Sequence, residues 1–327
     1  MHMALLTCTP GLQVRKLQDM PPSKNSATRP ATSVHVLQLP FRPPYDFEAV
    51  LGFLAPRAFA GLEHVDETSY ERSFGSPAQP GWLRVTRDPA TPNALRAELH
   101  GLSSADMADA ERLLRTMFDL DADPRVIGQA LARDPLLAPL VKQRPDTRVP
   151  GSWNGFEVAV RTVLGQQVSV KAARTFAARL VEAHGVPLAV PHPSGLDRLF
   201  PSPEVLAMAP LRGIGLTGAR AASVNTMAQA VAEGRVSFDP GQSLEVFLAS
   251  WIALPGIGDW TAQYLAMRAL HHPDAFPAGD LVLRKAASKG MDALLTIPAL
   301  RARAKDWSPW RSYAVIHLWQ TAAAQAV

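Results

Sequence analysis

Cysteine is almost absent from this chain, where Cys8 is the single cysteine among 327 residues. One thiol excludes a disulfide framework, a cysteine-ligated zinc site and a four-cysteine iron–sulfur cluster. So little cysteine is typical of a reducing compartment, and we expect a cytoplasmic protein. Long apolar runs are missing too: no stretch reaches membrane-spanning length and the mean hydropathy is close to zero, which argues against a transmembrane protein.

Metal-ligand spacing and a strong charge of one sign are also missing. The nine histidines show no such spacing, and His271 and His272 are adjacent, so they cannot share one helix face. The net charge is only +4, with four basic residues against one acid in residues 1–33 and seven against two in residues 281–327. A basic C-terminal face suits a polyanion such as nucleic acid, although a solvated basic surface is the more common reading.

Periodicity divides the first part of the chain in two. Residues 1–33 mix Pro, Ser, Thr and Asn with scattered charge and are predicted to form a disordered N-terminal extension. Residues 34–120 predict an α+β domain with a mostly antiparallel sheet, because period-two stretches accompany an amphipathic helix over 47–60. The expected strands span 34–39, 82–86 and 95–99.

From Ala105 onward the pattern is almost entirely helical, with Pro and Gly residues as breaks. The expected helices span 105–118, 124–132, 154–184, 203–209, 217–233, 243–253, 259–271, 280–289, 298–306 and 309–324. The predicted fold class is therefore α+β, a mixed and mainly antiparallel N-terminal domain followed by helical domains.

The segment Leu254–Gly258 reads Leu-Pro-Gly-Ile-Gly between two predicted helices. Gly256 and Gly258 let the backbone adopt positive φ and approach a partner closely. The free N–H groups at the start of the second helix lie at the positive end of its dipole and suit an anion such as a DNA phosphate. A plain tight turn between helices uses the same glycines, so the pentapeptide leaves both readings open.

Trp260 and Tyr264 lie four residues apart and therefore share one face of the second helix. Each combines a flat π surface with a polar atom, although such residues are more often part of a core. Asp280 follows an irregular stretch and precedes a new helix, a position typical of an N-cap. An N-cap carboxylate can also face a cleft, so a structural and a chemical role are compatible.

Four segments in this order resemble the helix-hairpin-helix DNA glycosylase (HhH-GPD) superfamily and, more narrowly, the bacterial 3-methyladenine DNA glycosylase II family. They are Leu39–Asp46 with Leu51–Leu54, Val163–Ser169, the hairpin Leu254–Gly258 followed by Asp280, and Trp310–Trp319. The resemblance extends from Leu39 to Ala324. It implies a helical domain with the hairpin at 155–272, and a second helical subdomain, carrying the catalytic aspartate, from 121–154 and 273–327.

The resemblance also assigns roles to single residues. Asp280 falls on the catalytic aspartate, Gln167 on the wedge that enters the DNA, and Gly256 and Gly258 on the DNA phosphate site. The base pocket would contain Phe53, Gln166, Trp260, Tyr264 and Trp319. A monovalent cation at the hairpin would be held by the backbone carbonyls of Ile252, Leu254 and Ile257, and catalysis would need no cofactor.

The chemistry agrees with these roles. A base must leave the helical stack before an enzyme can act on it. An N-alkylated purine such as 3-methyladenine or 7-methylguanine is positively charged and is attracted to aromatic faces by about 0.5–2 kcal/mol each. The charge makes the base a good leaving group, and a carboxylate such as that of Asp280 stabilises the oxocarbenium-like sugar.

One position indicates the reaction type. Bifunctional relatives place a nucleophilic lysine where this chain has Trp260, and no lysine lies between Lys171 and Lys285. We therefore expect simple hydrolysis, without strand cleavage. The resemblance implies a monomer acting on double-stranded DNA with alkylated bases. A glycosylase with another main substrate, such as hypoxanthine, and a non-catalytic DNA-binding module are the alternatives.

Two positions depart from the family pattern. Asp259 begins the second hairpin helix where a basic residue is expected, which places an acid near the expected phosphate. Gln167 stands in place of an apolar wedge and could hydrogen-bond the unpaired partner base. If the family resemblance is set aside, the simplest interpretation of Gln166 and Gln167 is that they are ordinary polar residues of a helix turn.

Overall fold

An antiparallel sheet of five strands forms the N-terminal part of the computed structural model, which describes residues 34–324. The strand order is β1-β5-β4-β3-β2. The strands are β1 (Val34–Pro40), β2 (Glu63–Val65), β3 (Ser69–Gly75), β4 (Pro80–Arg87) and β5 (Ala94–His100). The antiparallel sheet and the three predicted strands are confirmed, whereas the predicted extension 1–33 lies outside the described residues.

The predicted helix over 47–60 ends earlier than expected. Helix α1 (Phe47–Leu54) begins at its N-cap Asp46 and buries Phe47, Val50 and Leu51. The chain then continues as a 3-10 turn, η1 (Ala55–Arg57), which contains Pro56. Proline has no N–H to continue a helical hydrogen-bond ladder, so the helix stops there. This early stop brings Arg57 to the site described below.

Strands β2 and β3 were not predicted because their sequence is polar. Strand β3 contains Glu71, Arg72 and Ser73, yet all three are buried. The Arg72 guanidinium donates a hydrogen bond of 2.7 Å to the carboxylate of Glu157 on α5, which compensates for burying both charges. The partner lies 85 residues away in sequence, so local patterning gives no sign of it.

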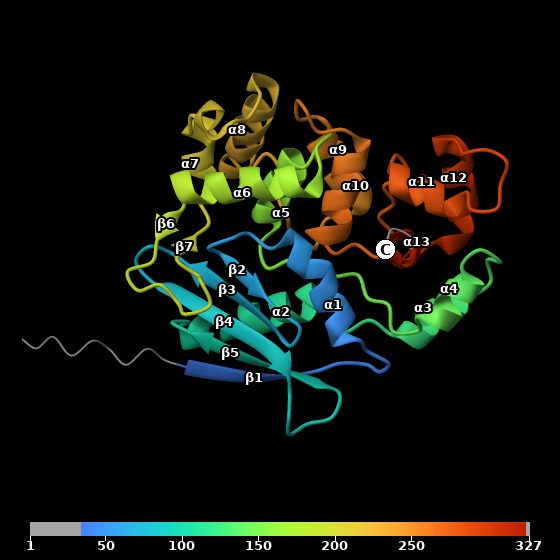
Figure 1. The fold of residues 1–327 in the computed structure, drawn as a ribbon, viewed down its shortest axis with the longest axis horizontal. Helices are drawn as coiled ribbons and strands as arrows, with labels where there is room; N and C mark the ends of the chain where they lie inside the picture. The colour runs from blue at the N-terminus through green and yellow to red at the C-terminus, as the bar shows by residue number, and fades with distance from the viewer. Residues whose placement is uncertain (1–33, 325–327) are drawn as a thin grey trace, which may run out of the picture. The chain divides into compact units, whose positions relative to one another are not determined.

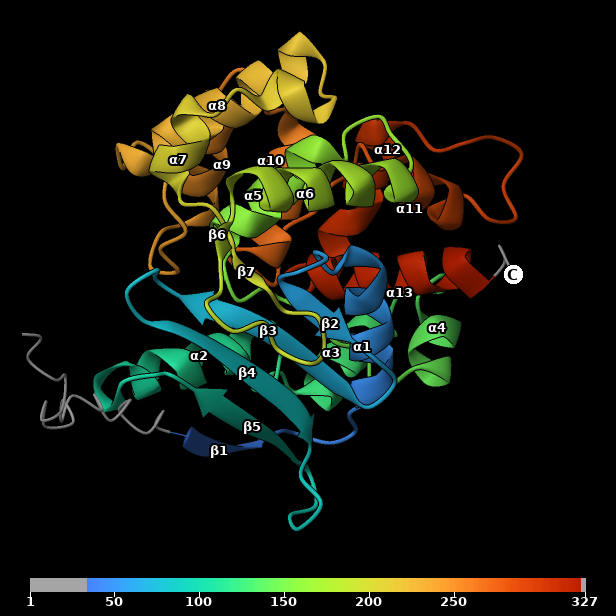
Figure 2. The same ribbon diagram turned by 60° about the vertical axis from the view of Figure 1, so that its left-hand side comes forward.

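The rest of the described chain is mainly helical (Figures 1 and 2). The α-helices are α2 (Met107–Met117), α3 (Pro124–Leu131), α4 (Ala138–Gln143), α5 (Gly155–Leu164), α6 (Val170–His184), α7 (Pro203–Met208), α8 (Gly218–Ala232), α9 (Leu244–Ile252), α10 (Asp259–Arg268), α11 (Leu281–Ala287), α12 (Ile297–Arg303) and α13 (Arg311–Ala324). The described chain also contains three more short 3-10 turns, η2 (Ser104–Asp106), η3 (Leu211–Ile214) and η4 (Ala304–Trp307). A small hairpin completes the fold and consists of β6 (Val186–Pro187) and β7 (Arg198–Leu199). No helix among residues 34–324 is long and apolar enough to cross a membrane.

The single helix predicted over 154–184 is wrong. The chain breaks between α5 and α6, where Gln167 has a positive φ of 55°. Ser169 then caps α6 by accepting a hydrogen bond from the amide of Ala172. The left-handed Gln167 follows the end of α5, and the N-cap Ser169 starts α6. The apolar residues keep a helical spacing on both sides of this break, which is why the sequence predicted one helix.

Two hydrophobic cores lie side by side. One is built on the sheet with α1 and α2, and the other on α5 and α8–α13. Phe53 packs against both of them. Figures 1 and 2 both show α4 next to α13, and these two helices are in contact. The segment before α5 thus lies beside the end of the chain, an arrangement compatible with the two-segment subdomain expected above.

Candidate active site

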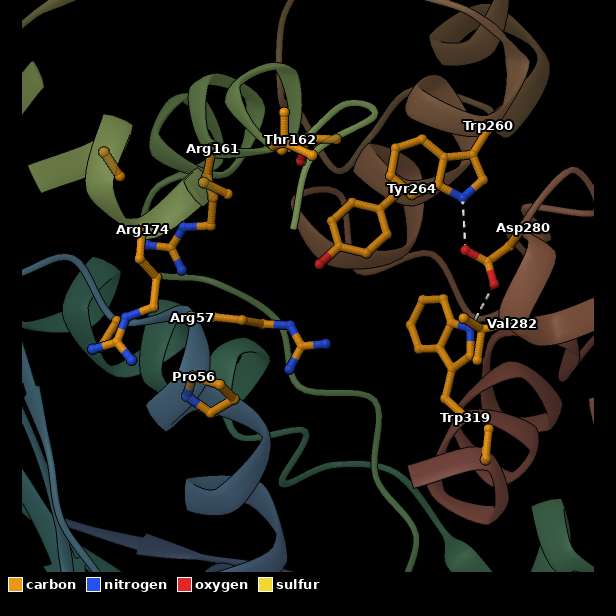
Figure 3. Close-up of a pocket in the computed structure, with 16 residues that line it drawn as sticks. Pro56, Arg57, Arg161, Thr162, Arg174, Trp260, Tyr264, Asp280, Val282 and Trp319 are labelled. Carbon is orange, nitrogen blue, oxygen red and sulfur yellow. Dashed lines mark hydrogen bonds between the residues drawn. The ribbon is translucent and has the colours of Figure 1, made fainter. Parts of the chain in front are cut away.

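A cavity of about 670 Å³ opens between η1 and the helices α5, α6, α10, α11 and α13 (Figure 3). Its lining comes from six elements and includes Arg57, Arg161, Thr162, Arg174, Trp260, Tyr264, Asp280, Val282 and Trp319. The volume suits one flipped base with part of its sugar, since ligand pockets span about 300–1,000 Å³. Four of the predicted site residues, Trp260, Tyr264, Asp280 and Trp319, line the cavity together.

Asp280 caps a helix and also lines the cavity, as its position suggested. It is the N-cap of α11, where one carboxylate oxygen, Oδ1, accepts a 2.7 Å hydrogen bond from the amide of Leu283. The same oxygen accepts from the indole N–H of Trp319 at 3.2 Å, and Oδ2 accepts from that of Trp260 at 3.1 Å. Three donors hold the carboxylate in one orientation at the cavity wall.

The aromatic side chains form a continuous wall. The rings of Trp260 and Tyr264 are stacked, with centroids 5.5 Å apart and an interplanar angle of 20°. The ring of Tyr264 lies 6.1 Å from that of Trp319 at 43°. Both indole N–H groups are directed to Asp280, so the rings present flat π surfaces to the cavity while their polar atoms are already bonded.

Basic side chains surround the phenol of Tyr264. Arg268 donates a 3.1 Å hydrogen bond to the Tyr264 oxygen, and its guanidinium carbon lies 4.7 Å from the ring centre of Phe53. Burial raises the pKa of Tyr264, but Arg268, Arg57 and Arg161 outweigh it and lower the pKa to about 8. Phe53 itself is not among the residues that line the cavity, because its ring lies between the guanidinium groups of Arg57 and Arg268.

The two glutamines of the α5–α6 break lie outside the cavity lining. Gln166 donates hydrogen bonds from Nε2 to the carbonyl of Gly256 at 3.0 Å and to the hydroxyl of Thr261 at 3.1 Å. It thereby ties this loop to the hairpin. Gln167 is exposed, and its backbone lies in the left-handed region with a φ of 55°. The structure leaves the pocket role of Gln166 and the wedge role of Gln167 as predictions.

The hairpin joins α9 to α10 as predicted. Gly256 has a φ of 83°, and a Cβ there would lie 2.1 Å from the hydroxyl of Ser223, so only glycine fits. Gly258 is the N-cap of α10 and has open space where a Cβ would lie. The acid at Asp259, unexpected near a phosphate, is paired with Arg301 on α12 at 2.7 Å.

Sequence analysis missed the arginines of the site. Arg57, Arg161 and Arg174 line the cavity, and Arg268 lies behind Tyr264. The i, i+4 spacing of Phe53 and Arg57, and of Tyr264 with Arg268, is the one sequence signal that could have indicated these contacts. That spacing is common on any helix, so it does not single out a site.

Comparison with known proteins agrees with this architecture. Residues 36–154 match the AlkA N-terminal domain family, and residues 160–292 match the HhH-GPD superfamily of base excision DNA repair proteins. The chain is 34% identical to DNA-3-methyladenine glycosylase 2 of Escherichia coli over 86% of this chain and 96% of that protein. It is 42% identical to the probable bifunctional transcriptional activator/DNA repair enzyme AlkA of Mycobacterium tuberculosis, over 90% of this chain.

The chain spans 58% of the length of the M. tuberculosis protein. Among solved structures, the 3-methyladenine DNA glycosylase from Archaeoglobus fulgidus has the same fold, with a TM-score of 0.75 over 90% of this chain and 99% of that one, at 19% identity. The sequence matches and the order of the two domains lead to one conclusion: the chain belongs to the AlkA family of helix-hairpin-helix base excision DNA repair proteins.

Proposed function

We propose that this chain is a monofunctional DNA glycosylase that hydrolyses the N-glycosidic bond of alkylated purines in double-stranded DNA. One observation carries the proposal: a carboxylate, Asp280, faces a base-sized cavity and is oriented by the indole N–H groups of two aromatic side chains of the same cavity. Such a carboxylate is suited to the positive charge that develops on the sugar as the bond breaks.

The aromatic wall supports a preference for cationic bases. Trp260, Tyr264 and Trp319 present π faces that attract a positively charged ring, most strongly at tryptophan. Ionisation of Tyr264, whose pKa is about 8, would strengthen this attraction at alkaline pH. A neutral base such as hypoxanthine gains less from the wall, so we expect slower release of hypoxanthine than of 3-methyladenine.

The experiment that tests the proposal compares wild type with Asp280→Asn. Asparagine keeps the size of the side chain and its capping ability but removes the charge. We expect the mutant to release 3-methyladenine from methylated duplex DNA about 10²–10³-fold more slowly, measured by chromatography under single-turnover conditions. Affinity for DNA containing an abasic site should stay within a few-fold of wild type.

Each other outcome has a definite meaning. Unchanged release by Asp280→Asn would keep the function and remove Asp280 from the chemistry. DNA binding without release of any base by wild type would favour a non-catalytic DNA-binding module.

The reaction is proposed to stop at the abasic site. Trp260 occupies the start of α10, and no lysine is among the cavity-lining residues of the described chain. An amine nucleophile is therefore missing where a Schiff base would form. Strand breaks without alkaline treatment, or covalent trapping by borohydride, would contradict this.

DNA contacts are proposed at the hairpin and the α5–α6 loop. The backbone N–H groups at Gly256 and Gly258 would approach a DNA phosphate, and exposed Gln167 would fill the gap left by the flipped nucleotide. Arg301 cancels the charge of Asp259, so the acid does not oppose a phosphate at full strength.

We also propose that the hairpin binds a monovalent cation through the backbone carbonyls of Ile252, Leu254 and Ile257. Helix α9 ends at Ile252, so its terminal carbonyls lie at the negative end of the helix dipole. The Leu254 carbonyl already accepts from the amide of Ile257 at 3.1 Å, and no acidic cluster suited to a metal ion lies among residues 34–324. Neutral oxygens suit a singly charged ion, so DNA affinity should fall when tetramethylammonium replaces potassium at constant ionic strength.

We also propose that the chain acts as a monomer in the cytoplasm, where chromosomal DNA of a bacterium is accessible. The low cysteine content is compatible with that compartment. Sedimentation of the free chain and of its DNA complex tests the monomer.

A further inference from the structure

A second turn between helices has almost the same sequence as the hairpin. Residues Leu211–Gly215 read Leu-Arg-Gly-Ile-Gly, whereas the hairpin reads Leu-Pro-Gly-Ile-Gly. In both turns the leucine and the isoleucine are buried and the other three residues are exposed. The one difference places Arg212 at an exposed position, where the hairpin has Pro255. This turn contains η3 and contributes nothing to the lining of the cavity.

The surroundings of η3 carry charge of one sign. The segments 165–181 and 205–232 contain five basic residues and no acidic residue. Arg179 on α6 donates a 3.4 Å hydrogen bond to a backbone carbonyl of η3, which brings the two segments together. Lys171, Arg179 and Arg212 are exposed, and none of the three has an ion-pair partner within residues 34–324. We call these three residues the α6–η3 surface.

The α5–α6 loop lies between this surface and the hairpin. The side chain of Gln166 donates to the Gly256 carbonyl of the hairpin at 3.0 Å, and its own carbonyl accepts from Arg220 on α8 at 2.6 Å. The loop is therefore attached to the hairpin on one side and, on the other, to the first turns of α8, which follows η3 in the chain. Exposed Gln167 is the next residue of this loop. Figures 1 and 2 both show α6 next to α7 and α8.

The cavity marks the side on which the strand with the flipped base must pass. Trp260, two residues after Gly258, lines the cavity, so this strand passes the hairpin. Arg174 on α6 also lines the cavity, but Arg179 lies five residues later, roughly 140° further around the helix, and does not. In a duplex the complementary strand lies on the other side of the residue that fills the gap. That side is the α6–η3 surface.

We propose that Lys171, Arg179 and Arg212 bind phosphates of the complementary DNA strand. Guanidinium and ammonium groups form charge-assisted hydrogen bonds with phosphate oxygens, and such contacts fix the orientation of a protein on a duplex without reading its sequence. This role rests on the proposed glycosylase function. It gives the enzyme a preference for duplex over single-stranded DNA, because a single strand lacks the phosphates that this surface binds.

The test combines Lys171→Met, Arg179→Met and Arg212→Met in one triple variant and measures its affinity for DNA with a tetrahydrofuran abasic site. We expect the triple variant to bind the duplex about tenfold more weakly than wild type at low ionic strength, with the slope of log affinity against log salt reduced by about 2–3. Affinity for the same oligonucleotide as a single strand should stay within about twofold of wild type.

Uncharged methylphosphonates identify the strand that the surface contacts. In the complementary strand, opposite the abasic site, they should weaken binding by wild type and have little effect on the triple variant. In the strand that contains the abasic site, they should weaken binding by both proteins to the same extent. If methylphosphonates in the complementary strand affect both proteins equally, the proposal is wrong.

A matched triple variant controls for the loss of positive charge. Arg125→Met, Arg133→Met and Lys142→Met remove three exposed basic residues on and between α3 and α4, and they should leave the preference for duplex DNA at the wild-type value.

A single substitution keeps the test valid if the first triple variant folds poorly. The Lys171 side chain makes no hydrogen bond within residues 34–324, so Lys171→Met should fold normally and reduce the salt slope by about 1. An unchanged salt slope in this variant would remove Lys171 from the DNA interface.

The failure of this proposal can be told apart from the failure of the proposed function. If wild type releases 3-methyladenine but the triple variant loses the same affinity for single strands and duplexes, the α6–η3 surface does not contact the complementary strand. If wild type releases no methylated base, the glycosylase function fails whatever the binding measurements show.

Discussion

At the residue scale, Asp280 combines a capping role with the chemical role that we propose for it. Its Oδ1 caps α11 through Leu283, and the same carboxylate is held against the cavity by Trp260 and Trp319. Capping fixes the backbone of Asp280, and the indoles fix its side chain. The carboxylate is therefore in position before DNA binds, which is what electrostatic stabilisation of a developing charge requires.

Tyr264 gives a prediction at the same scale. The chain has four tyrosines, and burial raises the pKa of Tyr45, Tyr70 and Tyr313 above the usual value. Among the four tyrosines, Tyr264 is the one whose pKa is lowered, to about 8, because the effect of nearby arginines outweighs that of burial. We expect a single tyrosine ionisation near pH 8 in the ultraviolet absorbance of the folded protein.

The matched variants assign that ionisation. It should vanish in Tyr264→Phe and move to higher pH in Arg57→Met, because one positive neighbour is lost. A transition that persists in Tyr264→Phe would mean that another tyrosine carries it.

At the element scale, the hairpin between α9 and α10 contains two glycines, and glycine occupies each position for a different physical reason. Gly256 needs its positive φ and the absence of a Cβ, which would meet Ser223. Gly258 has an ordinary φ of −91° and open space around its Cα. One glycine is required by the fold, while the other leaves room at the surface where we place a phosphate.

These two glycines should therefore respond differently to alanine. We expect Gly256→Ala to lower the free energy of unfolding by about 1–3 kcal/mol, from backbone strain and the contact with Ser223. Adding Ser223→Ala should recover part of that loss, because the hydroxyl is the nearest atom to the new Cβ. Urea denaturation measures both.

Gly258→Ala should leave the free energy of unfolding within about 0.5 kcal/mol of wild type. Its DNA affinity should nevertheless fall, because the new methyl group stands where a phosphate approaches the amide. Wild-type affinity in this variant would place the phosphate elsewhere.

At the scale of the whole molecule, a buried polar cluster joins distant parts of the chain. The carboxylate of Asp119, after α2, accepts from the amide of Val149 at 2.9 Å and from the hydroxyl of Tyr313 on α13 at 3.1 Å. His271, after α10, places Nε2 3.3 Å from the same carboxylate. Asp119 thus connects the N-terminal domain, the segment before α5 and the last helix.

This cluster predicts a pH dependence of stability. Burial lowers the pKa of His271, but Asp119 and the Val149 carbonyl outweigh it and raise the pKa above its usual value. A histidine whose pKa is raised in the folded state makes its full contribution to stability below the unfolded-state pKa of about 6.5. That contribution is lost as the pH rises through the folded-state pKa. The contribution of His271 to the free energy of unfolding should therefore fall as the pH rises from 6.

Asp119→Asn tests the source of that slope. We expect this variant to lose about 3 kcal/mol at pH 6, because a buried charged partner is removed, and to show a flatter dependence on pH. Asp109→Asn, in an exposed pair with Arg112, is the control and should change stability by less than about 1 kcal/mol. Parallel pH profiles for wild type and Asp119→Asn would contradict the role of His271.

Elements that depend on local physics could be predicted from the amino-acid sequence. Ser202, Thr217 and Ser243 cap the helices that follow them, because their short side chains reach the backbone amides of the first turn. The antiparallel sheet, the hairpin and the helix start at Asp280 follow in the same way from alternation, glycine and capping.

The contacts between these elements depend on how distant segments pack, and they could not be predicted. Polar strand β3 is buried because Glu157 reaches Arg72 from α5, and Trp319 meets Asp280 across 39 residues of sequence. Arg57 also enters the cavity through contacts with Phe53 and nearness to Tyr264. Charged and aromatic side chains look the same in sequence whether they face water or a partner, because burial and electrostatic pairing arise only when distant segments pack against one another.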